Sequence, residues 1–443
     1  MPTDLIRTLS LVSAVVVSAV TLTACGAGGD GSLNQEFTQR EQAAVIADEP
    51  QAALVGRDIL AQGGHPVDAA IAMSLALTVT LPSRAGLLGG GVCLVHDAGQ
   101  QGVSLIDFRP TPLRRADGSP SEFGAPGLLR GLFVMHARHG RLRFEQLVIP
   151  AERLARFDGR VSRSLRRDMD QFASRMAQIE NPIWRGSAEA NVGQELPWDV
   201  MAGALAIVRQ DGPGAFYGGR IGRRLALDMG VEPAAIAGVQ PVVVEAPSVV
   251  DGVDNLFMAG QADERQLIQA LASGGDSRQL AAASRLPGDV PPATSVVVKG
   301  DDDTVVACGL TQGMAFGIGE PTRDFGLWPA RGIATSMVLG DGILGPFLML
   351  NRNVNEMRLA GVVTGSDNLP RDVLAAATSV FDSYRTSPGN VSALTPTVGA
   401  STGAVGVGTP RRSMVSCSRA NNDGDRLCAA AVEPGINGLA IRP

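Results

Sequence analysis

The order of apolar and polar positions along the chain predicts helices and strands in alternation. Residues 51–62 carry apolar side chains at helical spacing and end at a Gly-Gly pair. Pro66 suits the first turn of a helix and Asp68 favours a helix N-terminus, so we expect a second, largely buried helix over residues 66–79. The runs "GGGVCLVHD" and "GVSLIDFR" then predict two strands joined by a Gly/Gln turn. We expect the glycine run to let the backbone pass close to another element.

The remaining pattern predicts a layered α/β fold, because strands near both ends of the chain flank a central block of helices. From Thr386 the chain is rich in Ser, Thr, Gly, Val and Pro, and this composition predicts an irregular, mobile tail over residues 386–443. The further helical patterns cover residues 125–175, residues 198–229 and "LPRDVLAAATSVFDSY", and strand-like runs lie at 240–250, 295–300 and 304–310 and in "RGIATSMVL", "LGPFLMLN" and "MRLAGVVTG".

The first residues form a pattern typical of an export signal. A positive flank precedes an apolar run that is too short for a good membrane span. The run ends in Leu-Thr-Ala-Cys, which resembles a bacterial lipobox, so residues 1–25 are expected to be a lipoprotein signal with Cys25 as the lipidated residue. The alternative is a plain secretory signal. Residues 26–48 are expected to be a flexible tether, and a cell-envelope location follows, at the outer membrane in a Gram-negative host.

The amino-acid composition argues against several classes of binding site. The net charge is −6 and no basic cluster occurs, which argues against nucleic acid as a partner. Lys299 is the single lysine, so no Gly-Lys-Ser/Thr phosphate loop exists. The four histidines show no metal-ligand spacing, and no metal is expected. The cysteines differ in context: Cys417 and Cys428 lie close together in a polar tail and could form a local disulfide, whereas Cys93 and Cys308 are expected to be buried thiols.

Three segments together carry a family resemblance. They are "LAQGGHPVDAAIAMSLAL" with the following "LPSRAGLLGGGVCLVHD" and "LIDFRPTPL", then "GAPGLLRGLFVMHARHGRLRFEQLVIPAERLA", then "GPGAFYGGRIGRRLALDM". The chain resembles a divergent and shortened γ-glutamyltransferase, with residues 49–385 as the matching domain. This resemblance implies a four-layer αββα N-terminal-nucleophile hydrolase fold, in which self-cleavage exposes a catalytic threonine. It implies no cofactor.

The resemblance also implies a substrate pocket. Arg109 in "DFRPTP" matches the arginine that grips the substrate α-carboxylate, and Asp324 in "TRDFG" matches the acid that holds the α-ammonium group. Thr335 and Ser336 in "ATSM" match a pair of hydroxyl donors to the carboxylate. Without the surrounding motif, a surface arginine at a strand end is the better explanation of Arg109, and Asp324 is a common loop acid. A bland strand explains Thr335 and Ser336 equally well.

The oxyanion turn and the nucleophile depart from the family pattern. "AGVVTGSDN" stands where the family has Pro-Gly-Gly, so Thr364 and Gly365 would supply the backbone N–H donors. An ungapped register places Pro292 at the nucleophile, which would make the protein inactive. A hairpin shortened by two residues instead places Thr294 and Ser295 at the two hydroxyl positions, with cleavage between residues 293 and 294.

Two functions therefore stay open at this point. The first is an envelope-anchored enzyme that transfers γ-glutamyl groups of glutathione-like peptides to an amino acid, or hydrolyses them with water, through Thr294. The second is an inactive family homologue that serves as an envelope binding or structural lipoprotein. A third option, another N-terminal-nucleophile amidase with changed specificity, lies between them. The substrate-binding residues favour the first function, and the altered cleavage site favours the second.

Overall fold

An apolar strand, β10, lies at the centre of the fold because its β-branched side chains are buried on both faces. In the computed structural model this strand spans Ala293–Lys299. Val296 and Val298 belong to one hydrophobic core, and Ala293 and Val297 to another. The structure describes residues 35–37, 43–182, 184–259, 292–333, 345–351, 353–365, 376, 380–382, 384–387, 411–419, 426–433 and 438–441.

β10 belongs to sheet I, which has seven strands within the described residues. Its described strands pair antiparallel throughout. The spatial order is β16 (Leu439–Ile441), β2 (Ala44–Ala47), β10, β11 (Val305–Thr311), β3 (Gly90–His96), β4 (Ser104–Asp107) and β7 (Val242–Glu245).

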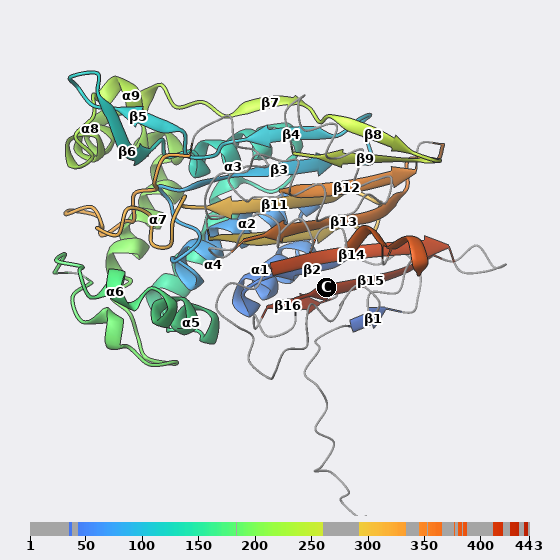
Figure 1. The fold of residues 1–443 in the computed structure, drawn as a ribbon, viewed down its shortest axis with the longest axis horizontal. Helices are drawn as coiled ribbons and strands as arrows, with labels where there is room; N and C mark the ends of the chain where they lie inside the picture. Colours follow the sequence, from blue (N-terminus) through green and yellow to red (C-terminus); the bar gives the residue numbers. More distant parts are fainter. Residues whose placement is uncertain are drawn as a thin grey trace, which may run out of the picture. The chain divides into compact units, whose positions relative to one another are not determined.

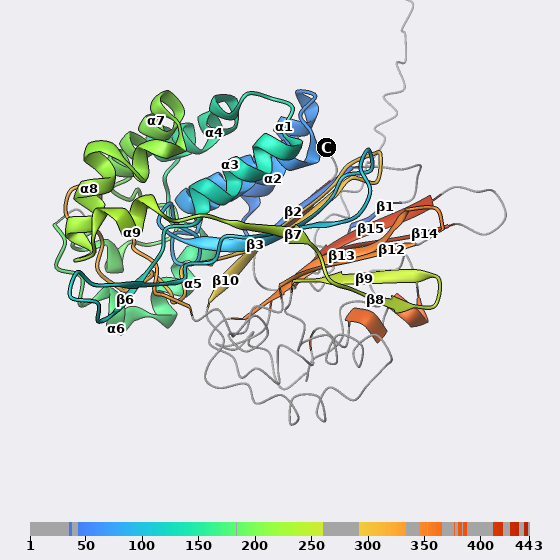
Figure 2. The ribbon, with the colours of Figure 1, turned by 90° about the horizontal axis from the view of Figure 1, so that it is seen from above.

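Sheet II stacks on sheet I, and the second hydrophobic core fills the space between them (Figure 1, Figure 2). Its described strands also number seven. In spatial order they are β1 (Gln35–Phe37), β15 (Arg426–Val432), β14 (Arg411–Arg419), β13 (Met357–Thr364), β12 (Pro346–Asn351), β9 (Asp254–Met258) and β8 (Ser248–Asp251). A separate hairpin consists of β5 (Pro112–Arg114) and β6 (Pro120–Gly124).

Helices cover the outer face of sheet I, as Figure 2 shows in the view from above. On the far face of sheet II, Phe381 lies in a helical segment and its ring contacts that of Phe347 on β12. The described helices are α1 (Pro50–Ala61), α2 (Pro66–Thr80), α3 (Leu128–His139), α4 (Phe144–Phe157), α5 (Arg163–Gln171), α6 (Ala173–Met176), α7 (Asp199–Asp211), α8 (Gly219–Asp228) and α9 (Pro233–Ala237), with 3-10 turns at Ser187–Glu189 and Pro213–Phe216.

The two N-terminal helices form as the sequence predicts. Asp68 completes a capping box at the start of α2, since its side chain accepts a hydrogen bond from the backbone N–H of His65 at 2.9 Å. The same carboxylate accepts the backbone N–H groups of Arg141 and Leu142, which ties the connection between α3 and α4 to α2. All fifteen residues of α2 are buried, which explains why its sequence has no polar face.

The glycines that begin β3 confirm the expected close backbone approach. A Cβ on Gly90 would lie 2.2 Å from the carbonyl oxygen of Phe108, and one on Gly91 would lie 2.4 Å from the carbonyl oxygen of Gly309. Any side chain here would push β3 away from its neighbours in sheet I.

Both ends assigned to irregular chain belong to the fold. The predicted tether ends too late, because β2 lies inside sheet I and Asp48 after it is fully buried. The predicted irregular tail is wrong for three segments, which form β14, β15 and β16. A strand can bury Ser and Thr when their hydroxyls form hydrogen bonds with other buried groups. Polar composition alone was therefore not a sign of disorder in these segments. The predicted strand "RGIATSMVL" lies outside the described residues after Ile333.

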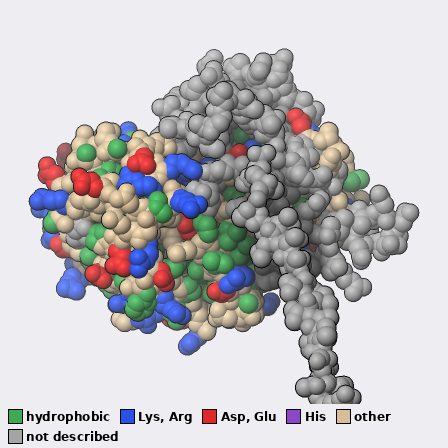
Figure 3. All heavy atoms as spheres, turned by 90° about the horizontal axis from the view of Figure 1, so that it is seen from below, with side chains coloured by type: hydrophobic (Ala, Val, Ile, Leu, Met, Phe, Trp, Pro, Cys, Tyr) green, Lys and Arg blue, Asp and Glu red, His purple; other side chains and the backbone are tan. Residues whose placement is uncertain are grey.

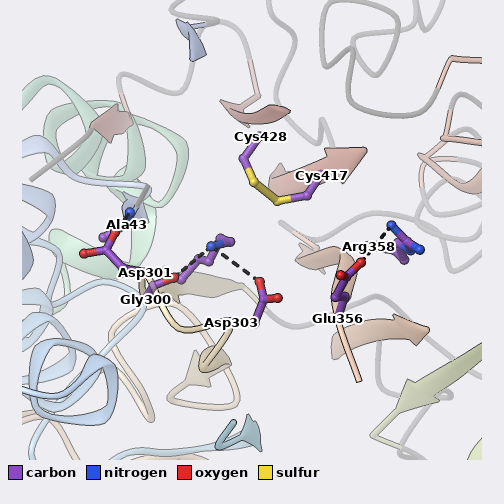
Figure 4. The surroundings of a disulfide bond; sticks show 9 residues. Ala43, Gly300, Asp301, Asp303, Glu356, Arg358, Cys417 and Cys428 are labelled. Carbon is purple, nitrogen blue, oxygen red and sulfur yellow. Dashed lines mark hydrogen bonds and ion pairs between the residues drawn. A yellow bond between two sulfur atoms is a disulfide. The ribbon is translucent and has the colours of Figure 1, made fainter. Parts of the chain in front are cut away.

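Two disulfides cross-link neighbouring strands. The Cys417–Cys428 bridge joins β14 and β15 and confirms the local pairing in the tail (Figure 4). The prediction of buried thiols at Cys93 and Cys308 is wrong in one respect: both are buried, but they form a bridge between β3 and β11. They face each other in the antiparallel register, although 215 residues separate them in sequence.

The described surface carries mixed charge. Figure 3 shows basic and acidic side chains interspersed over the described part of one face. Among the helices that the structure describes, none combines the length and the apolar character needed to cross a membrane.

Candidate active site

Thr294 is the second residue of β10, and its hydroxyl faces a buried carboxylate. Oγ1 of Thr294 donates to Oδ2 of Asp48 at 3.0 Å, and both side chains are fully buried. Asp48 directly follows β2, which pairs with β10, so the hydrogen-bonded sheet sets the position of the carboxylate. Asp48 was not among the predicted site residues, because it lies in the predicted tether. The apolar run directly before it, which forms β2, is the sequence signal that it belongs to the fold.

Three further hydrogen bonds hold the Asp48 carboxylate. Ser295 donates its backbone N–H to Oδ2 at 3.2 Å and its hydroxyl to Oδ1 at 2.8 Å. Ser413 on β14 donates its hydroxyl to Oδ1 at 3.2 Å, and the Ser295 and Ser413 hydroxyl oxygens lie 2.7 Å apart. Ser295, predicted as a catalytic hydroxyl, therefore lies against the same carboxylate as Thr294. It links that carboxylate to sheet II.

A second buried carboxylate, Asp168 on α5, lies between two arginines. Arg84 donates from Nε to Oδ2 of Asp168 at 2.7 Å and from NH2 to Oδ1 at 2.8 Å, which is a bidentate pair. Arg411 on β14 donates to Oδ1 at 3.3 Å, and the Ser83 hydroxyl donates to Oδ2 at 2.6 Å. The side chains of Arg84 and Asp168 are fully buried, and that of Arg411 is 4% exposed.

Arg411 joins the two carboxylates, since its guanidinium also lies 3.9 Å from Asp48. We refer to Asp48, Arg84, Asp168 and Arg411 as the buried charge cluster. Burial, with the like charge of Arg84, lowers the pKa of Arg411 to about 10, against the opposing effect of the two carboxylates. Arg411 therefore stays charged at neutral pH. Burial alone would raise the pKa of Asp168, but the two arginines outweigh it and the pKa lies below its ordinary value.

The peptide bond before Thr294 lies against this cluster. NH1 of Arg84 donates to the carbonyl oxygen of Ala293 at 3.3 Å and to that of Gly365 at 3.3 Å. The backbone N–H of Ala293 donates to the Gly365 carbonyl at 3.4 Å, and Pro292 forms an isolated parallel bridge with Gly365. The carbonyl that would be attacked in a cleavage before Thr294 therefore accepts a hydrogen bond from a buried cation.

Thr364 and Gly365 lie at this same junction, at the end of β13. The carbonyl of Gly365 points to Ala293 and Arg84, so the group observed there is an acceptor. The Thr364 hydroxyl is buried and has no hydrogen-bond partner within the described part of the chain. The turn predicted to bind the oxyanion is therefore adjacent to Ala293, one residue before Thr294.

Arg109 lies at the same end of sheet I as Thr294. Thr294 pairs with Leu310, Leu310 pairs with Gly91, and the backbone N–H of Phe108 donates to the carbonyl of Gly91 at 2.9 Å. These residues form one row across four strands. Three strand spacings separate Thr294 from Phe108, about 14 Å, and the long side chain of Arg109 begins one residue beyond.

The Arg109 guanidinium is already paired within the strand end. Its Nε donates to Oδ1 of Asp107 at 2.9 Å, and NH2 lies 2.5 Å from Oδ2, with 8% of the arginine side chain exposed. Asp324, predicted to hold an α-ammonium group, lies in a loop with 49% of its side chain exposed and accepts from Arg224 at 3.2 Å. The structure therefore does not pair Arg109 with Asp324.

The two predicted hydroxyl donors, Thr335 and Ser336, lie outside the described residues. The described chain before them ends at Ile333, whose backbone N–H donates to the carbonyl of Pro110 at 2.7 Å. That contact brings the chain to within one residue of Arg109. Within the described ranges, no group of three or more His, Cys, Asp or Glu side chains could hold a metal ion.

The N-terminal half of the chain is similar to known proteins. Residues 52–237 match the family model described as Gamma-glutamyltranspeptidase. Glutathione hydrolase 5 proenzyme of Mus musculus is 31% identical over 262 residues, which cover 54% of this chain and 44% of the relative. Glutathione hydrolase 3 of Arabidopsis thaliana is 30% identical over 212 residues, which cover 44% of this chain and 33% of the relative.

These matches support the predicted resemblance to a divergent member of the gamma-glutamyltranspeptidase family. The matched regions span less than half the length of these curated relatives. A crystal structure of cephalosporin acylase from Bacillus halodurans is similar over 92% of this chain and 96% of its own, with a TM-score of 0.66 and 15% identity. That likeness concerns the fold alone, and it confirms the predicted layered α/β fold with two stacked sheets.

The buried charge cluster generates a stability prediction. Asp168→Asn removes the charge between two buried guanidinium groups, and we expect it to lower the free energy of unfolding by about 3–5 kcal/mol. Asp170→Asn on the same helix is the matched control, because Asp170 pairs with Arg166 and 69% of its side chain is exposed. The control should change stability by less than about 0.5 kcal/mol. Urea unfolding of the two variants tests this, and equal losses would contradict it.

Proposed function

We propose that this protein belongs to the gamma-glutamyltranspeptidase family and transfers or hydrolyses γ-glutamyl groups, with Thr294 as an N-terminal nucleophile after self-cleavage. The observation that carries the proposal is the position of Thr294. Its hydroxyl lies on a buried carboxylate, at the same end of sheet I as Arg109. Family membership supports a substrate of the glutathione type, with an amino acid or water as the acceptor.

The chemistry follows from what cleavage would release. Hydrolysis before Thr294 yields a free α-amine on the nucleophilic residue itself, and this amine accepts the hydroxyl proton during attack on the substrate γ-carbonyl carbon. The C–N bond of the substrate breaks, the leaving amine takes a proton, and a γ-glutamyl ester forms on Oγ1. Water or an amino acid amine then attacks the ester and restores the hydroxyl.

Recognition of the γ-glutamyl group is assigned to the predicted pocket residues. An incoming α-carboxylate competes with Asp107 for the Arg109 guanidinium, whose planar fork suits a bidentate contact. Asp324 would hold the α-ammonium group, and its exposure leaves it accessible to a ligand. Thr335 and Ser336 would add hydroxyl donors, and the turn at Thr364 and Gly365 would lie next to the developing oxyanion.

One observation favours the second candidate, an uncut and inactive homologue with a binding or structural role. The turn at Gly365 is adjacent to Pro292 and Ala293, and neither residue has a hydroxyl. If the reacting group must occupy that position, Thr294 is one residue too far along β10. The two candidate functions can be distinguished by whether the peptide bond before Thr294 is cleaved.

We also propose that the protein is held at the cell envelope through a lipid on Cys25, which lies outside the described residues. The lipobox-like sequence supports this proposal. Wild-type protein from its host should partition into the detergent phase, and Cys25→Ala should move to the aqueous phase or accumulate as an unprocessed precursor. Wild-type protein found wholly in the aqueous phase would contradict the anchor.

Cleavage can be seen directly by electrophoresis, provided that the disulfide is taken into account. Cys93 and Cys308 lie on opposite sides of the bond before Thr294, so the bridge would hold the two pieces together. We expect one band without reductant and two bands with it, the smaller beginning at Thr294. Thr294→Ala should give a single band under both conditions. A single band from reduced, folded wild-type protein would favour the inactive homologue.

If Arg109 binds the substrate, its removal should lower turnover without affecting self-cleavage. Arg109→Ala should be cleaved normally but should turn over a γ-glutamyl anilide with a kcat/KM reduced by about 30-fold or more, equivalent to about 2–4 kcal/mol. Arg109→Lys should recover only part of this loss, because an ammonium group does not reproduce the planar fork. Unchanged kcat/KM in Arg109→Ala would remove this residue from the substrate site.

A further inference from the structure

Two buried charged groups contact the atoms that react when the bond before Thr294 is cut. The attacking atom, Oγ1 of Thr294, lies 3.0 Å from Oδ2 of Asp48. The carbonyl oxygen of Ala293 lies 3.3 Å from NH1 of Arg84. Asp48 follows β2 in the N-terminal part of the chain, and Arg84 lies just after α2, so the fold brings both to this bond across more than 200 residues of sequence.

We infer that Asp48 is the general base, and Arg84 the oxyanion-stabilising group, of self-cleavage between Ala293 and Thr294. This inference rests on the proposed function, because it concerns the step that would expose the nucleophile. Both residues are catalytic for that step, since each contacts a reacting atom. Neither belongs to the γ-glutamyl pocket around Arg109.

The step balances without a further reactant other than water. Asp48 takes the hydroxyl proton as Oγ1 of Thr294 bonds to the carbonyl carbon of Ala293, and the negative charge on the carbonyl oxygen is stabilised by Arg84. The C–N bond then breaks, and the proton held by Asp48 passes to the new α-amine of Thr294. Water hydrolyses the resulting ester, which leaves a carboxylate on Ala293 and the free hydroxyl on Thr294.

The geometry around each group keeps it in place. The Asp48 carboxylate is oriented by Ser295 and Ser413. Arg84 is oriented by its bidentate contact with Asp168, which leaves NH1 directed at the two carbonyls. Because the site is buried, these interactions are stronger than they would be in water, and the donors need no reorganisation as charge develops.

Ser413, Asp168 and Arg411 are therefore positioning residues for cleavage. Ser413 and Arg411 come from β14, a strand close to the C-terminal end of the described chain. The cleavage machinery is complete only when β2, the segment after α2, α5 and β14 have all packed around β10. Self-cleavage is thus expected to follow folding of both sheets, and not to precede it.

The test measures cleavage and turnover in the same set of full-length variants. Asp48→Asn keeps the size and an acceptor oxygen but removes the base, and the conversion rate on reducing gels should fall by about 100-fold or more. Arg84→Lys keeps the charge but not the fork, and we expect a slowing of about 10²-fold or more. Asp170→Asn is the control and should convert at the wild-type rate. Cooperative unfolding and an intact Cys93–Cys308 bridge show which variants are folded.

The outcomes separate this inference from the proposed function. A folded Asp48→Asn or Arg84→Lys protein that converts at the wild-type rate overturns the inferred role of that residue, even if the wild-type enzyme turns over γ-glutamyl substrates. Normal conversion that depends on Asp48 and Arg84, without γ-glutamyl turnover, supports the inference and overturns the proposed function. A folded wild-type protein that never converts overturns both. If Asp48→Asn does not fold, Arg84→Lys decides the outcome.

Discussion

The buried charge cluster is the constraint on which the arrangement around β10 depends. Two carboxylates and two guanidinium groups lie out of contact with water, with side-chain exposures between 0% and 4%. Each charge would be costly to bury alone, so the four must be present together and in good geometry. They come from the end of β2, the segment after α2, α5 and β14. The cluster therefore links the helical layer to both sheets.

The Asp48 carboxylate of the cluster also explains why two hydroxyl side chains lie buried near the start of β10, before its three valines. Thr294 and Ser295 are adjacent and so point to opposite faces of the strand, yet both reach the carboxylate of Asp48. Asp48 can accept hydrogen bonds from both hydroxyls because it lies just beyond the end of the neighbouring strand, β2. Pro292 precedes the strand, where its missing N–H leaves no ladder hydrogen bond unmade, and its contact with Gly365 joins the two sheets at this end.

Much of the fold could be predicted from the sequence, because the helices and central strands have strong periodicity and clear ends. The helix predicted over residues 66–79 is observed as Pro66–Thr80, with Asp68 in its first turn as expected. The failures have a common physical cause. β14 and β2 are stabilised by partners far away in sequence, and local composition does not report such partners. Ser413 in the predicted tail is buried, and its hydroxyl contacts Asp48 and Ser295, both more than 100 residues away in sequence.

The candidate site was predictable only where a motif covered it. Arg109 and Thr294 could be placed by resemblance, and the structure puts them at one end of sheet I. Arg84 and Asp168 could not, since each is a common residue in an ordinary local context, and for Asp48 the apolar run before it indicates a strand but no role in the site. Their significance lies in the charges they bring together, and charge pairing across more than 80 residues has no periodic signal in a single sequence.

The strand order of sheet I bears on what a cut before Thr294 would do. β10 and β11 would belong to the C-terminal piece, but β2 and β3 on either side of them would belong to the N-terminal piece. The C-terminal hairpin would thus stay hydrogen-bonded along both edges, and β16 would pair with the outer edge of β2. The Cys93–Cys308 bridge would add a covalent link between the pieces. Because the layers are held by these pairings, the cut is not required for the fold, and its effect would be chemical: it would place a free amine next to the Thr294 hydroxyl.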